Sequence, residues 1–255
     1  MRIRSLPALL LSLGLLTGCF PKGDVSQPIP QRLLPAPQEA RRLVVVLPGR
    51  GDDLDALGRS GIAQAVQAAW PDADVVLTGL ALGYYMQGQA PERLRREVVQ
   101  PARERGYREV WLLGASMGGM GGLMYDRLYG EEIDGLVLLA PYLGEKELLR
   151  EIRDAGGVAA WNAGPVPAAV DADNFSRELW RHLQGWQRKP SRARKAWLAY
   201  GDGDRLREAD AILASLLPPD HVLVPPGGHT WTVWSPAARE LLLRADAARG
   251  SEGAR

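Results

Sequence analysis

Cysteine is nearly absent from this chain of 255 residues, in which Cys19 is the single example. One cysteine excludes an internal disulfide and a structural zinc site built from several thiolates. An excess of charge of one sign is also missing, because 31 basic and 30 acidic residues leave a formal net charge of +1. No global field therefore favours nucleic acid as a partner. Histidine is scarce too, with three residues, so few candidates exist for a catalytic base.

Long apolar runs are absent except at the N-terminus, where Leu6 to Leu16 follow the basic residues Arg2 and Arg4. This run is too short to span a bilayer comfortably, and it ends at Leu16-Thr17-Gly18-Cys19. The segment 1–19 resembles a bacterial lipoprotein signal peptide. The resemblance implies cleavage before Cys19, a lipid such as palmitate on that cysteine, and an extracytoplasmic protein anchored to the membrane. Phe20, in place of aspartate, implies sorting to the outer membrane, facing the periplasm.

Residues 20–41 are rich in proline and poor in apolar side chains. This composition predicts an extended tether, which at ~3.1 Å per residue would hold a domain up to ~60 Å from the membrane. The remaining residues suffice for one domain, predicted over 42–248, and residues 249–255 are predicted to be a frayed tail.

Short apolar runs alternate with helical segments along this domain, and several runs are apolar throughout. Such runs are typical of strands buried on both faces of a parallel sheet. The sequence therefore predicts an α/β fold with a doubly wound, mainly parallel six-stranded sheet. The predicted strands are 43–47, 74–77, 110–113, 135–140, 196–200 and 221–224.

Proline and glycine mark the ends of the predicted helices, which cover 59–70, 91–105, 120–129, 205–217 and 235–248. Pro101 predicts a kink or a break in the second of them, and Ser235 is predicted to cap the last. Residues 141–194 are too long for a plain crossover and predict a small helical cap with helices at 145–155 and 176–186. The basic residues of 188–195 favour a solvated loop, with an anionic lipid or substrate contact as the alternative.

A Gly-x-Ser-x-Gly pattern, from Gly114 to Gly118, lies directly between an apolar run and a helical segment. The pattern alone is weak, but the order strand, sharp turn and helix predicts a serine held in strained backbone geometry with its hydroxyl exposed. The two glycines provide the small residues that such a turn needs. Ser116 is the predicted nucleophile.

A serine hydroxyl needs a base, and His229 is the best placed of the three histidines. It follows the last predicted strand, so it lies at the sheet edge where Ser116 must also lie. His182 falls in a cap helix, with a surface position favoured, and His221 begins a strand. The orienting acid is expected after the preceding strand, where Asp204 is favoured over Asp202, although helix capping is an alternative role for Asp204.

The order Ser116, Asp204, His229 resembles that of the α/β-hydrolase superfamily, in a compact esterase-like form without the first two strands. In that family an oxyanion hole is formed by the backbone N–H of the residue after the nucleophile, here Met117. A second N–H comes from the loop after the first strand of this form, here Arg50. Pro48 stands where the family often has histidine, so the loop of Arg50 departs from the family pattern at this position.

The resemblance implies acyl transfer through an acyl-enzyme on Ser116, with a small-molecule or lipid ester as substrate and without a metal or other cofactor. Tyr84, Tyr85 and Trp161 are candidates to line an acyl or aromatic pocket, with ordinary packing as the alternative. Thioesterase, lipase or peptidase activity would use the same residues. A binding or envelope-assembly lipoprotein without turnover is the alternative from another class. The oligomeric state is left open.

Overall fold

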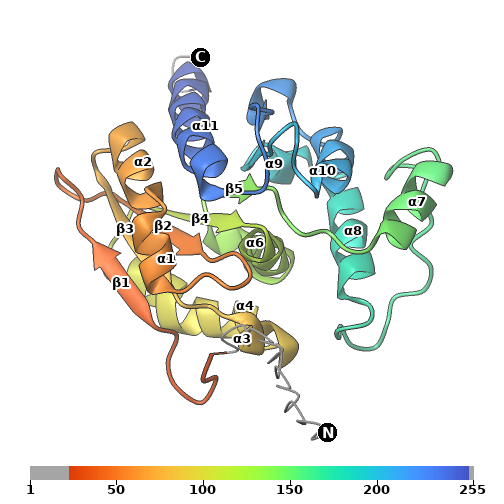
Figure 1. Ribbon diagram of the computed structural model, residues 1–255, viewed down its shortest axis with the longest axis horizontal. Coiled ribbons are helices and arrows are strands. Elements are labelled where there is room, and N and C mark those ends of the chain that lie inside the picture. Colours follow the sequence, from red (N-terminus) through yellow and green to blue (C-terminus); the bar gives the residue numbers. More distant parts are fainter. Residues whose placement is uncertain (1–22, 253–255) are drawn as a thin grey trace, which may run out of the picture.

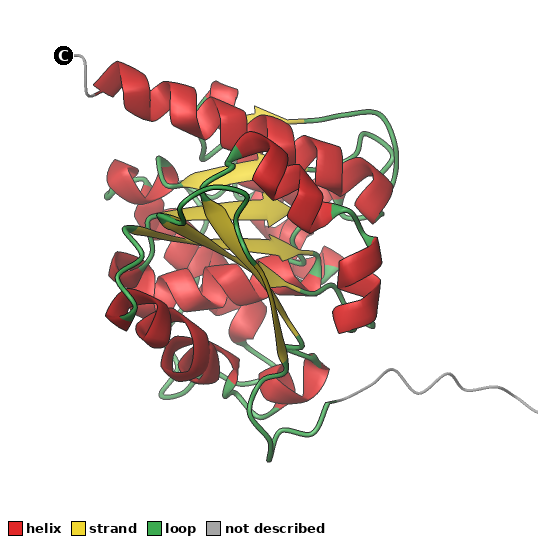
Figure 2. Cartoon of the chain, turned by 90° about the vertical axis from the view of Figure 1, so that its left-hand side faces the viewer, coloured by secondary structure: helices red, strands yellow, loops and turns green. Residues whose placement is uncertain are grey.

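The computed structural model describes residues 23–252 and contains one seven-stranded sheet with helices on both faces (Figures 1 and 2). The strand order is β1-β3-β2-β4-β5-β6-β7. Six strands correspond to the six predicted apolar runs, and these six are parallel to one another. The α/β fold with a mainly parallel sheet is therefore confirmed. These six strands are β2 (Arg42–Leu47), β3 (Ala73–Thr78), β4 (Glu109–Ala115), β5 (Gly135–Leu139), β6 (Ala196–Ala199) and β7 (Val222–Leu223).

The seventh strand, β1 (Gln31–Leu34), pairs antiparallel with β3 at one edge of the sheet. It lies in the segment predicted to be an extended tether, so that prediction is wrong for these residues and the sheet has one strand more than expected. An edge strand is held by backbone hydrogen bonds along one side, and therefore needs few apolar side chains. Leu33, which is 50% exposed, shows how little of β1 is buried.

The helices cover the sheet in two layers (Figure 2). On one face, α2 (Ile62–Ala69) packs against β3 and α11 (Trp231–Glu252) against β5 and β6. On the other face, α6 (Met117–Tyr129) crosses β2, β4 and β5 and packs against α4 (Ala90–Leu94). The predicted helix 59–70 is divided at Ser60 and Gly61, with α1 (Leu54–Arg59) before α2.

The predicted irregularity at Pro101 is present as a π-helical turn. The turn η1 (Arg95–Val99) joins α4 to α5 (Gln100–Glu104), which contains the proline. Proline has no backbone N–H, so in an α-helix the carbonyl of Glu97 would lose its partner. The side-chain amide of Gln31 in β1 donates to that carbonyl at 3.2 Å. The edge strand therefore satisfies a group that the proline leaves open.

The last helix begins earlier than predicted, at Trp231, and contains Pro236. Ser235 is not its N-cap: its hydroxyl donates to the carbonyl of Ser60 at 2.9 Å. The remaining elements are α3 (Leu82–Met86), α10 (Arg207–Ala214), and the 3-10 turns η2 (Gly130–Glu132) and η3 (Pro219–His221).

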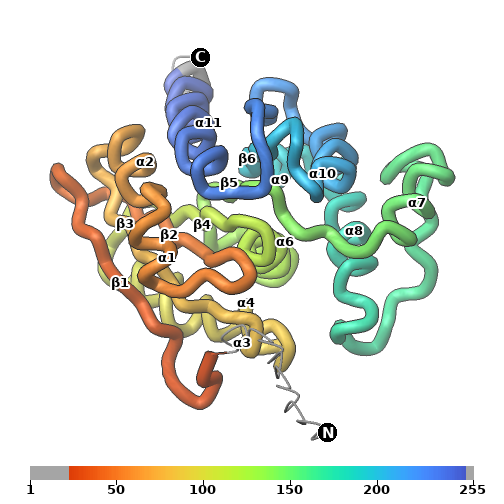
Figure 3. Tube along the Cα trace, in the orientation of Figure 1, coloured from red at the N-terminus to blue at the C-terminus, as the bar shows by residue number. Residues whose placement is uncertain are grey.

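The cap segment, residues 141–194, extends to the side of the sheet and contains α7 (Lys146–Asp154), α8 (Phe175–Trp186) and the short α9 (Pro190–Ala193) (Figure 3). Helix α8 packs against α6, the helix that follows Ser116. The indole of Trp180 is fully buried and donates to the carbonyl of Leu143 at 2.8 Å, which ties α8 to the chain leaving β5. The position of the cap segment is thus fixed relative to the sheet.

Candidate active site

Ser116 occupies a strained turn between β4 and α6, with φ 53° and ψ −113°. Positive φ is costly for a residue with a side chain and persists only where the surroundings hold it. Three backbone hydrogen bonds do so: the Ser116 N–H donates to Leu139 at 2.8 Å, and its carbonyl accepts from Met120 at 3.1 Å and Tyr142 at 3.0 Å. The serine is 6% exposed. Its hydroxyl is thereby fixed at the carboxyl end of the sheet.

The flanking glycines are required by close backbone contacts. A Cβ on Gly114 would lie 2.2 Å from the carbonyl oxygen of Gly118. A Cβ on Gly118 would lie 2.3 Å from the carbonyl oxygen of Leu47 and 2.7 Å from that of Pro48. All three distances are far below van der Waals contact, so the loop after β2 lies directly on the first turn of α6. The pattern Gly-x-Ser-x-Gly therefore has a steric origin here.

His229 and Asp204 complete a linear arrangement with Ser116. The Nε2 of His229 lies 2.9 Å from the Ser116 hydroxyl, and its Nδ1 lies 2.9 Å from each carboxylate oxygen of Asp204. The Asp204 side chain is fully buried, and its Oδ1 also accepts the N–H of Leu206 at 2.8 Å. With its proton on Nδ1 facing the carboxylate, a neutral His229 leaves Nε2 to accept the serine proton.

Asp202 and His221 lie outside this arrangement. Asp202 accepts the N–H of Gly227 at 2.9 Å and donates its own N–H to the carbonyl of Pro225 at 2.9 Å, so it shapes the loop that leads to His229. The His221 ring stacks on Trp197 at 3.6 Å, and burial lowers its pKa. The structure thus brings together the three residues that the sequence favours and gives these two a structural position.

The predicted oxyanion residues come from the start of α6 and from the loop after β2. Met117 is the first residue of α6, and N–H groups in the first turn of a helix have no acceptor within it. Arg50 belongs to the loop after β2 that rests on Gly118. Its charge opposes the rise in the pKa of Tyr142, which burial and a hydrogen bond to Glu145 bring to about 12. The Arg50 guanidinium therefore lies within electrostatic reach of Tyr142 in the loop after β5.

The predicted pocket residues are separated in the structure. Tyr84 is 1% exposed, and its hydroxyl donates toward the carbonyls of Asp24 at 3.3 Å and Gln27 at 3.4 Å. Trp161 is 3% exposed and donates to Glu151 at 2.9 Å inside the cap segment. Both side chains are used in packing, which is the alternative that the sequence left open.

Tyr85 lies beside the helix that Ser116 begins. A Cβ on Gly121 of α6 would lie 2.1 Å from the Tyr85 hydroxyl. That hydroxyl is buried without a hydrogen-bond partner among the described residues, and burial raises the pKa of Tyr85. Tyr85 therefore contacts the nucleophile's own helix.

His182 is not on the surface, contrary to the favoured prediction. Its Nε2 lies 2.6 Å from a carboxylate oxygen of Asp126 in α6, and the two side chains are 12% and 7% exposed. Arg192, from the predicted solvated loop, donates to the carbonyl of Asp126 at 2.7 Å. This His182–Asp126–Arg192 cluster joins α8 and α9 of the cap segment to α6. The position of its members in the sequence gives no sign of the contact.

Asp210 is a further buried acid close to the site. It is fully buried in α10, and neither carboxylate oxygen has a hydrogen-bond partner within residues 23–252. Burial first, and then the charge of Asp204, raise the pKa of Asp210 well above its usual range. Burial therefore favours the neutral form of Asp210, and Asp204 is the acid that faces His229.

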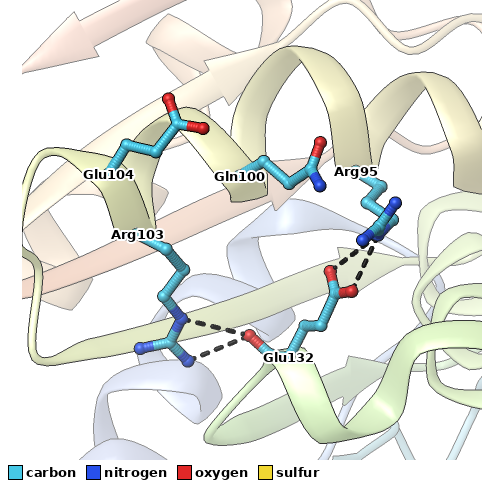
Figure 4. A pocket seen from close by; sticks show the side chains of 5 residues that line it. All are labelled: Arg95, Gln100, Arg103, Glu104 and Glu132. Carbon is cyan, nitrogen blue, oxygen red and sulfur yellow. Dashed lines mark hydrogen bonds and ion pairs between the residues drawn. The ribbon is translucent and has the colours of Figure 1, made fainter.

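Two hollows lie away from Ser116. One, of about 370 Å³, is lined by Arg95, Gln100, Arg103, Glu104 and Glu132 (Figure 4), where Glu132 already accepts bonds from both arginines. The other, of about 260 Å³, lies between α6 and the cap segment and includes Met124 and Phe175.

The described residues contain no group of three or more His, Cys, Asp or Glu side chains placed to hold a metal ion. Across the same part of the chain, every helix is too short or too polar to cross a membrane. The predicted lipidation site, Cys19, and the whole predicted signal segment lie outside the described residues.

Known structures share this architecture at low sequence identity. The chain is similar to Est1E from Butyrivibrio proteoclasticus, with 14% identity, a TM-score of 0.55, and coverage of 87% of this chain and 94% of that one. It is also similar to FphF, a fluorophosphonate-binding serine hydrolase of Staphylococcus aureus, with 13% identity, a TM-score of 0.56, and coverage of 85% and 98%.

A monoacylglycerol lipase of Paleococcus ferrophilus aligns with 14% identity, a TM-score of 0.53, and coverage of 86% and 100%. No protein-family model and no curated protein sequence matches the chain. The chain therefore has an α/β-hydrolase-like fold whose structural neighbours include esterases and lipases.

Proposed function

We propose that the protein is a serine hydrolase that cleaves carboxylic esters through an acyl-enzyme on Ser116. The observation that carries the proposal is the contact of Ser116, His229 and Asp204, with 2.9 Å between each pair of neighbouring polar atoms. These residues are far apart in the sequence and come from three loops at one edge of the sheet. A base that is itself oriented by a buried acid is what a serine needs to become nucleophilic.

In the first half of the reaction, His229 Nε2 takes the proton of Ser116 as the serine oxygen attacks the ester carbonyl. The imidazolium that forms is stabilised by the Asp204 carboxylate, which stays ionised and holds the ring in place. The tetrahedral intermediate then collapses, His229 gives its proton to the leaving alcohol, and the acyl group remains on Ser116.

In the second half, His229 activates a water molecule that attacks the acyl-enzyme, and the acid is released as the proton returns to Ser116. The oxyanion in both halves would accept hydrogen bonds from the backbone N–H groups of Met117 and Arg50. Each such donor is typically worth about 3 kcal/mol of transition-state stabilisation. For Arg50, support comes from the position of its loop on the first turn of α6.

The structural neighbours support an ester as the substrate class. One structure of Est1E has ferulic acid bound, and aligns with a TM-score of 0.52. FphF is described as binding fluorophosphonates, reagents that modify activated serines. The proposal for this chain is a carboxylic ester, with hydrolysis at the acyl carbonyl.

Labelling with a fluorophosphonate probe tests this function. Wild-type protein is expected to be labelled, and Ser116→Ala is expected to lose the label. Ser215→Ala is a matched control, because the Ser215 hydroxyl only donates to the carbonyl of Ile212 in α10. An unlabelled wild-type protein that hydrolyses no p-nitrophenyl ester would refute the proposal.

We further propose that the enzyme is lipid-anchored through Cys19 on the outer membrane, facing the periplasm. Support comes only from the sequence of residues 1–20. Metabolic labelling with palmitate is expected to mark the wild-type protein and to leave Cys19→Ser unmarked. Recovery of the wild-type protein in the inner-membrane fraction would contradict the sorting prediction.

A further inference from the structure

The loop after β2 is tied to the loop of His229 by one carboxylate oxygen. The Oδ2 of Asp52 accepts the backbone N–H of Gly49 at 3.1 Å and the indole N–H of Trp231 at 2.9 Å. We propose that Asp52 is a positioning residue, which holds the loop of Arg50 in the geometry that the oxyanion requires. This inference rests on the proposed hydrolase function and adds a residue that touches neither the substrate nor Ser116.

Close contacts fix the position of the loop after β2. Leu47 and Pro48 contact Gly118 in the first turn of α6, and a Cβ on Gly49 would lie 2.9 Å from the Asp52 carboxylate. The N–H of Asp52 donates back to the Gly49 carbonyl at 3.1 Å, so the chain closes into a tight turn around Arg50. The direction of the Arg50 N–H is set by this turn.

Trp231, the other partner of Asp52, lies among the residues that surround His229. Trp231 follows His229 by two residues and begins α11. Its ring packs edge-on against Trp234 at 5.3 Å, and Trp234 packs edge-on against His229 at 4.6 Å. Asp52 therefore connects the loop proposed to bind the oxyanion with the residues that surround the base.

Pro48 gives this contact its significance. Proline has neither a side-chain donor or acceptor nor a backbone N–H, so position 48 gives the loop no hydrogen bond through these groups. The Asp52 carboxylate supplies a support from within the same turn. Because both donors meet one oxygen, an asparagine amide oxygen at that place accepts the same two hydrogen bonds without the charge.

The test compares the hydrolysis of p-nitrophenyl butyrate by wild type, Asp52→Ala and Asp52→Asn. Alanine is expected to lower kcat about 10- to 100-fold with KM within about threefold of wild type, since a displaced donor weakens transition-state binding. Asparagine is expected to retain activity within about threefold. Active sites are counted by exhaustive fluorophosphonate labelling, so that loss of folded protein is separated from slower turnover.

Trp231→Phe provides a milder variant that keeps an aromatic ring but removes the indole donor. It is expected to lower kcat about 3- to 10-fold. The double variant, Asp52→Ala with Trp231→Phe, is expected to have the kcat of Asp52→Ala alone, because the two substitutions remove the same contact. Asp53→Ala is the matched control: Asp53 caps α1 by accepting the Ala56 N–H at 2.7 Å and makes no bond to Gly49. It is expected to leave kcat unchanged.

The inference fails if Asp52→Ala keeps the wild-type kcat per active site, if Asp52→Asn loses as much as alanine, or if the effects at Asp52 and Trp231 add. In each of these outcomes the wild-type protein still labels and turns over, so the proposed function stands. If the wild-type protein shows neither labelling nor turnover, the proposed function itself is refuted.

Discussion

Replacement of Asp210 by asparagine is expected to become more favourable to the stability of the folded protein as the pH rises from acid to neutral. The Asp210 carboxyl is fully buried, lacks a hydrogen-bond partner in the described part of the chain, and lies within the electrostatic reach of Asp204. Folding therefore raises its pKa. Such a group binds its proton more tightly in the folded state than in the unfolded state.

The sign of the pH dependence follows from that difference. Below the unfolded pKa, near 3.8, Asp210 is protonated in both states, so its ionisation does not change the free energy of unfolding. As the pH rises above that value, the unfolded chain loses the proton while the folded protein keeps it, so stability falls. The loss is about 1.4 kcal/mol per pH unit until the folded pKa of Asp210 is reached, and it levels off above. Asparagine has no proton to lose, so the stability of Asp210→Asn does not fall with pH in this way.

Urea unfolding of wild type and Asp210→Asn at half-unit intervals from pH 4.5 to pH 7.5 measures the difference. The free-energy gap is expected to widen with pH in favour of asparagine, whatever constant offset the amide introduces. Glu208→Gln is the control, since Glu208 lies on the same helix, is half-exposed, and pairs with Arg153. Its effect is expected to stay below about 1 kcal/mol at every pH. A gap between wild type and Asp210→Asn that is flat across this range would refute a neutral buried Asp210.

Two histidine substitutions separate chemistry from structure. In p-nitrophenyl ester assays, His229→Ala is expected to lower kcat by several orders of magnitude at unchanged fold. His221→Ala is expected to keep turnover but to lower the thermal midpoint in melting curves, and the opposite result would contradict the assignment of the base. Arg192→Gln is expected to lower the free energy of unfolding by about 2 to 3 kcal/mol, since it removes a charged partner of buried Asp126. Arg194→Gln, an exposed change in the same segment, is expected to have little effect, and equal losses from the two arginines would contradict a specific contact.

The fold and the central contact were predictable from sequence because both depend on local patterns. A strand buried on both faces reads as an apolar run, and the carboxyl ends of parallel strands meet at one sheet edge. A polar residue in the loop that follows such a run is thereby placed near that edge. Ser116, Asp204 and His229 each stand in that position, and the structure brings them into contact.

The rest depends on contacts that no local pattern encodes. β1 is held by backbone pairing at an edge, which its proline-flanked sequence does not show. His182 and Asp126 are 56 residues apart, and their contact depends on how the cap segment lies on α6. Tyr84 and Trp161 are aromatic residues near the right loops, but a ring packs wherever apolar surface is available. Asp52 has an ordinary loop sequence, and only the position of Trp231 gives it a partner beyond its own turn.

The segment that begins at Gly23 is pinned to the domain. Arg93 donates to the carbonyls of Val25 at 2.8 Å and Gln27 at 2.6 Å, Tyr84 holds the same stretch, and Gly23 lies beside Ala81. Ala81 follows the carboxyl end of β3, the edge of the sheet that also carries Ser116.

The folded domain therefore takes in residues that the proline content assigns to a ~60 Å spacer. If Cys19 carries a lipid as proposed, the described domain begins four residues after the anchor, at Gly23.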